Sequence, residues 1–246
     1  MPELTTVEWV YIIATLAILP AIIFGFYAQL KVMGAFRRFS RIKTPNDITA
    51  GQLAEQMLRD NNADVHVDLG HGHLSDHYDP RTKSVVLSPE VYHSNSIAAY
   101  GIAAHEVGHA IQDATGYAPL KIRQIVVKST NLINKLLLPI IVIGMIAQIF
   151  VFYDSPIMVY FIGALVVFYF LTFLISVITL PTEYNASNRA MELLRQSNTM
   201  DDRELRGARK VLSAAALTYL ASLVISLVYF IRFAAWLLII TSNRRR

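Results

Sequence analysis

Long runs without a charged side chain constrain the fold of this chain more than any other feature. Residues 9–30 and 211–231 contain no Asp, Glu, Lys or Arg, and in residues 136–182 the only charged side chain is Asp154. A helix of about 20 apolar residues crosses a hydrocarbon core about 30 Å thick. The chain is also 54% hydrophobic and only 16% charged, which is too apolar for an ordinary soluble domain. The sequence therefore predicts a membrane protein.

Four spans are predicted, at residues 9–30, 136–152, 157–180 and 211–240. A turn signal, Tyr-Asp-Ser-Pro at residues 153–156, divides the second span from the third, so these two form a hairpin. The fourth stretch meets Arg232, and the sequence leaves open whether it crosses the membrane once or is re-entrant. We expect Arg232 itself to extend to an interface, as long basic side chains near helix ends do.

Basic residues gather at one end of these spans. They follow the first span and flank the outer ends of the hairpin: Lys31, Arg37, Arg38, Arg41, Lys43, Lys121, Arg123, Lys128, Lys135, Arg189 and Arg195. Positive residues favour the cytoplasmic side, so we expect the N-terminus outside and the two polar segments, residues 44–134 and 181–210, in the cytoplasm. The expected fold class is mainly α, with multi-pass helices in the cytoplasmic membrane and a small cytoplasmic α+β region.

The polar segment 44–134 contains Ala-His-Glu-Val-Gly-His-Ala-Ile-Gln at residues 104–112. On a helix His105 and His109 share a face, so both ring nitrogens can bind one metal ion. Glu106 beside them is placed to take a proton from a metal-bound water. A chance match on a polar surface helix is the alternative, but the apolar flanks argue for a buried helix. Gly108 costs about 1 kcal/mol in a helix, which suggests close packing by a second helix or a substrate.

Short elements are expected around this motif. Residues 49–60 have helical apolar spacing, residues 65–69 and 84–88 read as strands, and Tyr-Asp-Pro-Arg at 78–81 reads as a turn. The motif helix is expected to begin at Ser94 or Ser96. The strand at 84–88 is either a substrate-binding edge strand or a core strand. Together these elements predict a zincin-like metalloprotease domain.

A catalytic zinc site needs a third protein ligand, which here must be His, Asp or Glu because the chain has no cysteine. We favour Glu183, which follows an expected helix break at Pro181 and lies on the same predicted side of the membrane as the histidines. The rivals are other histidines in residues 44–134: His71, His73, His77 and His93. His77, next to two aspartates, is also a candidate for stabilising an oxyanion.

Three segments resemble one family. His-Glu-Val-Gly-His-Ala-Ile-Gln at residues 105–112, Ser-Asp-His-Tyr-Asp-Pro at 75–80 and Leu-Pro-Thr-Glu-Tyr-Asn-Ala-Ser at 180–187 together are similar to the YugP-like neutral zinc metallopeptidases of prokaryotic membranes. The resemblance covers nearly the whole chain. It implies one zinc ion per chain, with His105 and His109 as ligands and Glu106 as the catalytic acid and base.

A more distant resemblance is to the membrane heat-shock proteases and the CAAX prenyl proteases. In those families a glutamate on a later helix completes the zinc site, and Glu183 matches it. They usually carry an aspartate four residues further on, oriented toward a zinc-binding histidine, whereas this chain has Ser187. Asp113 is a candidate substitute, and a plain helix-end charge is its alternative role.

We therefore expect a membrane-embedded zinc endopeptidase acting on proteins or peptides, including membrane proteins. Its substrate carbonyl oxygen would be stabilised by zinc and by His77, Tyr184 or Arg189. A non-catalytic membrane scaffold with a structural zinc is the alternative, and a metal transporter is disfavoured because the spans carry almost no polar ligands. Nucleic acid is not an expected partner, since membrane orientation explains the net charge of +4.

Overall fold

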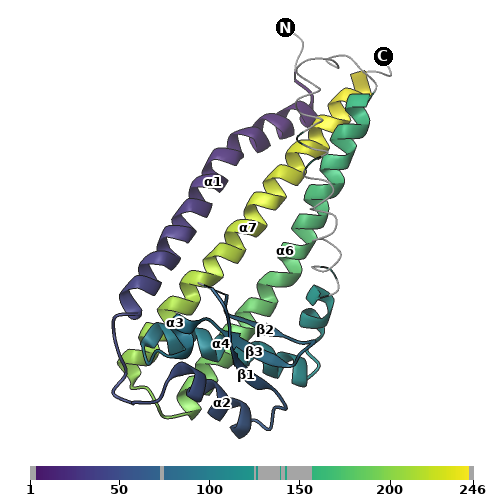
Figure 1. Cartoon of the computed structure of the whole chain (residues 1–246). Coiled ribbons are helices and arrows are strands. Elements are labelled where there is room, and N and C mark those ends of the chain that lie inside the picture. The colour runs from purple at the N-terminus through teal and green to yellow at the C-terminus, as the bar shows by residue number, and fades with distance from the viewer. Residues whose placement is uncertain are drawn as a thin grey trace. The chain divides into compact units, whose positions relative to one another are not determined.

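Long helices dominate the structure, a computed structural model that describes residues 4–72, 75–124, 126, 139, 142 and 157–243. Three of the described helices are long and apolar enough to cross a membrane: α1 (Thr6–Phe39), α6 (Ile157–Gln196) and α7 (Asp202–Asn243) (Figure 1). The prediction of a mainly α membrane protein is confirmed.

Two of these helices differ from the predicted boundaries. We expected a break at Pro181, but α6 continues through it, which is consistent with the tolerance of membrane helices for internal proline. The fourth stretch is one unbroken helix, since α7 has 42 residues and so a length of about 63 Å. A re-entrant break is therefore absent from α7. The second predicted span, 136–152, lies outside the described residues except for Pro139 and Val142.

The chain forms two compact units, and α1, α6 and α7 each contribute to both. The first unit contains Met1–Phe26, Ile122–Ile178 and Leu220–Arg246, and the second contains Tyr27–Lys121 and Thr179–Tyr219. Every residue of the predicted metal site belongs to the second unit.

Arg232 holds α7 to α1 within the first unit. Its guanidinium donates hydrogen bonds to Thr15 Oγ1 at 3.3 Å and to the Tyr11 hydroxyl at 3.4 Å. It also lies over the rings of Tyr11, Phe233 and Trp236, at 5.1 to 5.8 Å from their centroids. The side chain that we expected to extend alone to an interface is thus bonded to a neighbouring helix, which reduces the cost of its charge in an apolar setting.

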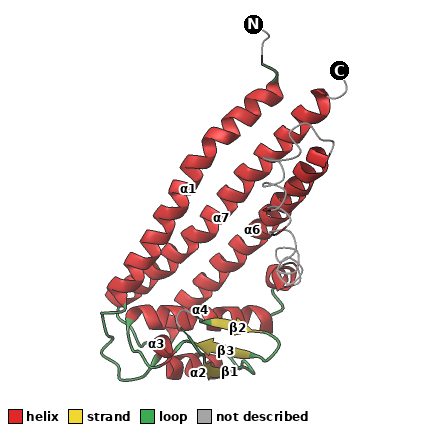
Figure 2. Ribbon diagram, turned by 45° about the horizontal axis from the view of Figure 1, so that its top comes forward, coloured by secondary structure: helices red, strands yellow, loops and turns green. Residues whose placement is uncertain are grey.

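A three-stranded sheet forms one layer of the second unit. Its strands are β1 (His66–Leu69), β2 (His77–Asp79) and β3 (Ser84–Leu87), in the order β1-β3-β2. β1 is parallel to β3, and β2 is antiparallel to β3. Figure 2 shows these strands in yellow among α2 (Ala50–Asp60), the short α3 (Pro89–Tyr92) and α4 (Ile97–Ala114).

The sheet corrects two expectations. β2 occupies the start of the segment that we expected to be a turn, because three residues are too few to show an alternating pattern. β3 has a paired strand on both sides, so of the two alternatives for residues 84–88 the core strand is confirmed and the substrate-binding edge strand is wrong. Its side chains agree with a central position, since Ser84, Val85 and Leu87 are all buried.

Local capping sets where the helices begin. Thr49 and Gln52 form a reciprocal capping box at the start of α2. Ser96 caps α4 by accepting a hydrogen bond from the Ala99 amide at 3.2 Å, which selects Ser96 over Ser94 as the predicted N-cap. The motif helix therefore starts at Ile97, eight residues before His105.

α4 is the central element of the second unit, and 13 of its 18 residues are buried. It packs against α2, α3, β2 and β3. Gly108 lets α6 approach this helix closely, because a Cβ atom added there would lie 2.7 Å from the Ala186 carbonyl oxygen. The expectation of a close neighbour at Gly108 is confirmed, and the neighbour is the backbone of a second helix.

Gly108→Ala should lower stability and loosen α6 from α4. The added methyl group meets a backbone carbonyl that cannot rotate away, so we expect a loss of about 1–3 kcal/mol despite the better helix propensity of alanine. Thermal unfolding in detergent measures this loss. Gly101→Ala on the same helix is the matched control, since its Cβ would meet Ala208 at an ordinary 3.7 Å. Equal stability of the two variants would contradict the packing argument.

Candidate metal centre

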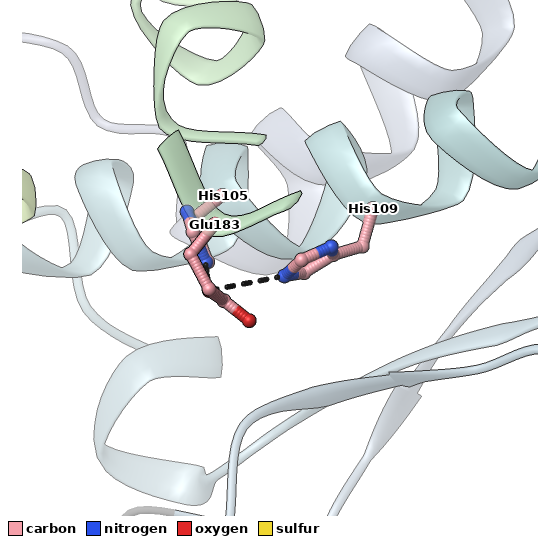
Figure 3. Close-up of side chains that lie close together, drawn as sticks. All are labelled: His105, His109 and Glu183. Carbon is pink, nitrogen blue, oxygen red and sulfur yellow. Dashed lines mark hydrogen bonds and ion pairs between the residues drawn. The ribbon is translucent and has the colours of Figure 1, made fainter. Parts of the chain in front are cut away.

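Three side chains from two helices converge at one buried point. His105 and His109 lie on α4, and Glu183 lies on α6. Glu183 Oε2 is 3.1 Å from His105 Nε2 and 3.5 Å from His109 Nε2, as Figure 3 illustrates. The ligand atoms of all three lie within 4.8 Å of one another, and the Glu183 side chain is only 1% exposed.

This donor set fits a zinc ion. Two imidazole nitrogens and a carboxylate oxygen are common zinc ligands, and at bond lengths of 2.0–2.2 Å the ligands of a tetrahedral ion lie roughly 3.4 Å apart. The observed separations of 3.1 and 3.5 Å match that spacing. A cation would also compensate a carboxylate that is almost fully withdrawn from water. His105, His109 and Glu183 are therefore the residues that could hold the metal.

Hydrogen bonding determines the ionisation state of the Glu183 carboxyl group. Burial alone would raise the pKa of its carboxyl group. Hydrogen bonds to His105 and His109 outweigh burial and hold the pKa well below its ordinary value. The group is therefore an anion in this site, which is the state that binds a metal ion.

The same pairing acts on His109 in the opposite direction. Burial would lower the pKa of its imidazole, but the hydrogen bond to Glu183 and the negative charge of Glu106 raise it above the ordinary value. The buried ring is thus stabilised in its positive form by two carboxylates. A metal ion on Nε2 would supply that positive charge in place of the proton.

Gln112 orients His109, a role that our sequence analysis missed. Its side chain is fully buried, and its Oε1 lies 2.9 Å from His109 Nδ1. Its Nε2 donates to the Thr182 carbonyl at 2.8 Å and to Asn185 Oδ1 at 3.0 Å. Because the amide nitrogen is engaged with two acceptors, the amide oxygen faces the ring, and His109 carries a proton on Nδ1. The unprotonated Nε2 then directs its lone pair toward Glu183.

The signal for Gln112 was present in the sequence. It lies three residues after His109, on the same face of a helix with apolar flanks. A polar side chain on a buried helix needs partners. Which atoms those partners are depends on α6, which is about 70 residues away in sequence.

His105 is oriented by Ser187. The Ser187 hydroxyl lies 3.3 Å from His105 Nδ1, at the position where the distantly similar proteases usually carry aspartate. A hydroxyl can accept the ring proton as a carboxylate does, but without a negative charge. Asp113, the other candidate, instead accepts a hydrogen bond from the Tyr78 hydroxyl at 2.9 Å. Burial and this bond raise the pKa of Tyr78.

Glu106 lies in the buried part of α4, next to His105 and 9% exposed. It is separate from the three-residue metal group, but close enough for its charge to act on His109. Within the described residues its carboxylate has no hydrogen bond to another side chain. A carboxylate in this position is available to a water molecule at the metal site.

The structure does not bring the other predicted residues into the metal group. His71, His77 and His93 are described but lie outside it, and His73 is not among the described residues. His77 is exposed, with Nδ1 2.6 Å from the Ser75 carbonyl, so its neutral ring carries the proton there and presents Nε2 as an acceptor.

Tyr184 and Arg189, both on α6, also lie outside the metal group. The Tyr184 side chain follows Glu183 in the chain and is 45% exposed. Arg189 Nε donates to Asn185 Oδ1 at 2.9 Å. Asn185 accepts from Gln112 as well, so Arg189 is linked to His109 through two side chains.

Comparisons with known proteins identify the family to which this chain belongs. Residues 14–238 match the family described as "Putative neutral zinc metallopeptidase". The chain is 34% identical over 210 residues to the "Putative membrane protease YugP" of Bacillus subtilis (strain 168), covering 85% of this chain and 89% of that protein. No solved structure matches the fold. Because the family match extends over almost all of the sequence, the chain belongs to this family of neutral zinc metallopeptidases.

Proposed function

We propose that the protein is a membrane-embedded endopeptidase that uses one zinc ion held by His105, His109 and Glu183. The observation that carries this proposal is the meeting of two Nε2 atoms and one carboxylate oxygen at a buried point beside Glu106. Family membership supports the same metal and the same reaction class.

The chemistry follows from the residues around that point. Zinc bound there would supply a Lewis acid that polarises a peptide carbonyl and lowers the pKa of a water molecule toward about 7. Glu106 accepts the proton of the attacking water and returns it to the leaving amine. Gln112 and Ser187 hold the two imidazoles in the orientation that directs Nε2 to the metal. For the substrate carbonyl oxygen, His77, Tyr184 and Arg189 remain the proposed additional stabilisers, His77 only in its protonated form.

A scaffold with a structural zinc is the second candidate. Structural zinc sites are normally closed by four protein ligands. Among the described residues the group has three members, and a carboxylate with no structural partner lies next to it. Both features support a site that keeps one position for water.

We also propose that the metal site faces the cytoplasm and that the N-terminus lies outside. The ends of α1, α6 and α7 that belong to the second unit are the ends with basic residues, such as Lys31, Arg195 and Lys210. Three further arginines follow α7 in the sequence, at residues 244–246, so the proposed orientation rests on the larger number of basic residues near the second unit.

Glu106→Gln should retain zinc and lose most of its activity. Glutamine has a similar shape but cannot take up a proton, so we expect cleavage of casein to fall by about 10²–10⁴-fold at unchanged zinc content. Glu183→Ala should lose zinc. Glu192→Gln, an exposed change of the same kind on α6, is the control and should behave as wild type. Undiminished cleavage by Glu106→Gln would refute the proposed mechanism, and zinc without cleavage in the wild type would favour the scaffold.

Removing the metal should abolish cleavage reversibly. Dialysis against a chelator is expected to stop casein hydrolysis by the wild type, and stoichiometric zinc should restore it. Activity that persists in metal-free protein would contradict the zinc-dependent reaction.

Gln112→Ala should weaken zinc binding by about 10–100-fold, because His109 loses the acceptor that fixes its orientation. Competition with a chromophoric chelator measures this affinity. Asp113→Ala is the matched control one residue further along α4, and its zinc affinity should stay within about twofold of wild type because Asp113 bonds to Tyr78. The opposite order of the two variants would make Asp113 the relevant partner.

The absence of cysteine makes the orientation directly testable. A membrane-impermeant maleimide should label Leu4→Cys in intact spheroplasts and should label Asp60→Cys only after lysis. Both substituted residues are exposed, so reagent access depends on the side of the membrane. The reverse labelling pattern would place the metal site outside.

A further inference from the structure

A cavity of about 970 Å³ lies in the second unit, and His105, His109 and Glu183 are not among its lining residues. Its walls come mainly from the last part of α1 and the first part of α7, and Tyr184 of α6 completes them. A volume of this size is within the range of cavities that bind small molecules. Of the residues proposed for the peptidase reaction, only Tyr184, a candidate stabiliser of the substrate carbonyl oxygen, lines it.

Five cations line this cavity, and no acidic residue does. They are Lys31, Arg38, Arg206, Arg209 and Lys210. Within the described part of the chain, none of them is in an ion pair with a carboxylate. Lys31 and Arg38 lie over the rings of Tyr27 and Phe39, which carry no negative charge. The cavity therefore has a strong positive potential without an internal counter-ion.

Two acidic residues, Asp201 and Glu204, line a neighbouring cavity of about 470 Å³ together with three of the cations, Arg38, Arg206 and Lys210. Asp201 Oδ1 accepts from the Glu204 amide at 2.7 Å, and Glu204 Oε2 accepts from the Asp201 amide at 2.8 Å. This pair caps the start of α7, so the hydrogen bonds of both carboxylates are to backbone amides and not to the cations of the cavity.

The rest of the wall is apolar or small. It contains Gly34, Ala35, Phe39, Ala214 and Leu217. A Cβ atom added to Gly34 would meet no heavy atom within 4 Å, so the wall is open at that residue. A ligand that fits must combine an anionic group with an apolar body.

The chain order places this cavity where the apolar runs meet polar sequence. Lys31 directly follows the uncharged run 9–30, and Ser213 and Leu217 lie at the start of the uncharged run 211–231. In a membrane protein this transition lies at the level of the lipid headgroups. Basic pockets between helices at that level recognise anionic lipid headgroups.

We propose that this cavity binds one anionic phospholipid. The phosphate lies among the five cations, and an acyl chain follows the apolar wall past Gly34 and Ala214. None of the five cations is a proposed metal ligand, and the lipid proposal does not require peptidase activity.

The test is lipid binding to the full-length protein in a neutral detergent, measured by native mass spectrometry. Phosphatidylglycerol should bind saturably as a single molecule, and phosphatidylcholine with the same acyl chains should bind at least about tenfold more weakly. Lys31→Gln combined with Arg209→Gln should weaken phosphatidylglycerol binding by at least tenfold, since each cation contributes about fivefold.

Two further variants separate charge from shape. Arg37→Gln combined with Arg195→Gln removes two exposed cations that do not line the cavity and should leave the affinity unchanged. Gly34→Leu keeps every charge but fills the acyl-chain path, so it should weaken phosphatidylglycerol binding by about tenfold. Because Gly34 has open space beside it, this variant is expected to fold, and its thermal midpoint checks that.

Three outcomes would overturn the proposal. Equal binding of phosphatidylglycerol and phosphatidylcholine would show that charge is not recognised. If the Arg37→Gln, Arg195→Gln control lost as much phosphatidylglycerol affinity as the Lys31→Gln, Arg209→Gln variant, the effect would come from net charge and not from the cavity. Wild-type affinity in Gly34→Leu, together with full competition by glycerol phosphate, would show a site for a soluble phosphate instead of a lipid.

Discussion

The contact between Gly108 of α4 and the Ala186 carbonyl of α6 is the constraint on which the candidate metal centre depends. A side chain at position 108 would separate the two backbones, because its Cβ would lie 2.7 Å from that oxygen. Glu183 is one helical turn before Ala186, so its carboxylate reaches both histidines only when the helices are this close. The glycine of the His-Glu-Val-Gly-His motif thus determines whether Glu183, more than 70 residues further along the chain, can contact the histidines.

Burying the Glu183 carboxylate costs free energy, which two imidazoles offset by direct contact and Gln112 offsets by holding one of those imidazoles in place. Glu183 is almost fully withdrawn from water and lies against two imidazoles. Gln112 then satisfies His109, the Thr182 carbonyl and Asn185 with one side chain. Removing one side chain from this hydrogen-bonded network would destabilise the fold, since its partners would stay buried without hydrogen bonds. The network also restricts each ring to one orientation, which a metal site needs before the metal arrives.

The sequence predicted those parts of the structure that depend on local chemistry. The N-cap of α4 is Ser96, one of the two serines that the sequence offered, because capping involves residues only three positions apart. The predicted break at Pro181 was wrong, the choice between an edge and a core position for β3 was left open, and Gln112 and Ser187 were missed as partners of the two histidines. The strand position and the histidine partners depend on neighbours far away in sequence: the order of three strands, and the side of α6 that faces α4.

The sequence by itself determined that the chain enters a membrane and that two histidines and a glutamate share one helix. Long uncharged runs form membrane-spanning helices, and residues four apart share one helix face, wherever the helices lie in the fold. Only the tertiary structure decided which carboxylate joins the histidines, that Gln112 and Ser187 orient them, and that five cations surround an apolar cavity. The physical reason is that hydrogen bonds and cavities depend on distances of a few ångströms between separate helices, and helix periodicity carries no information about those distances.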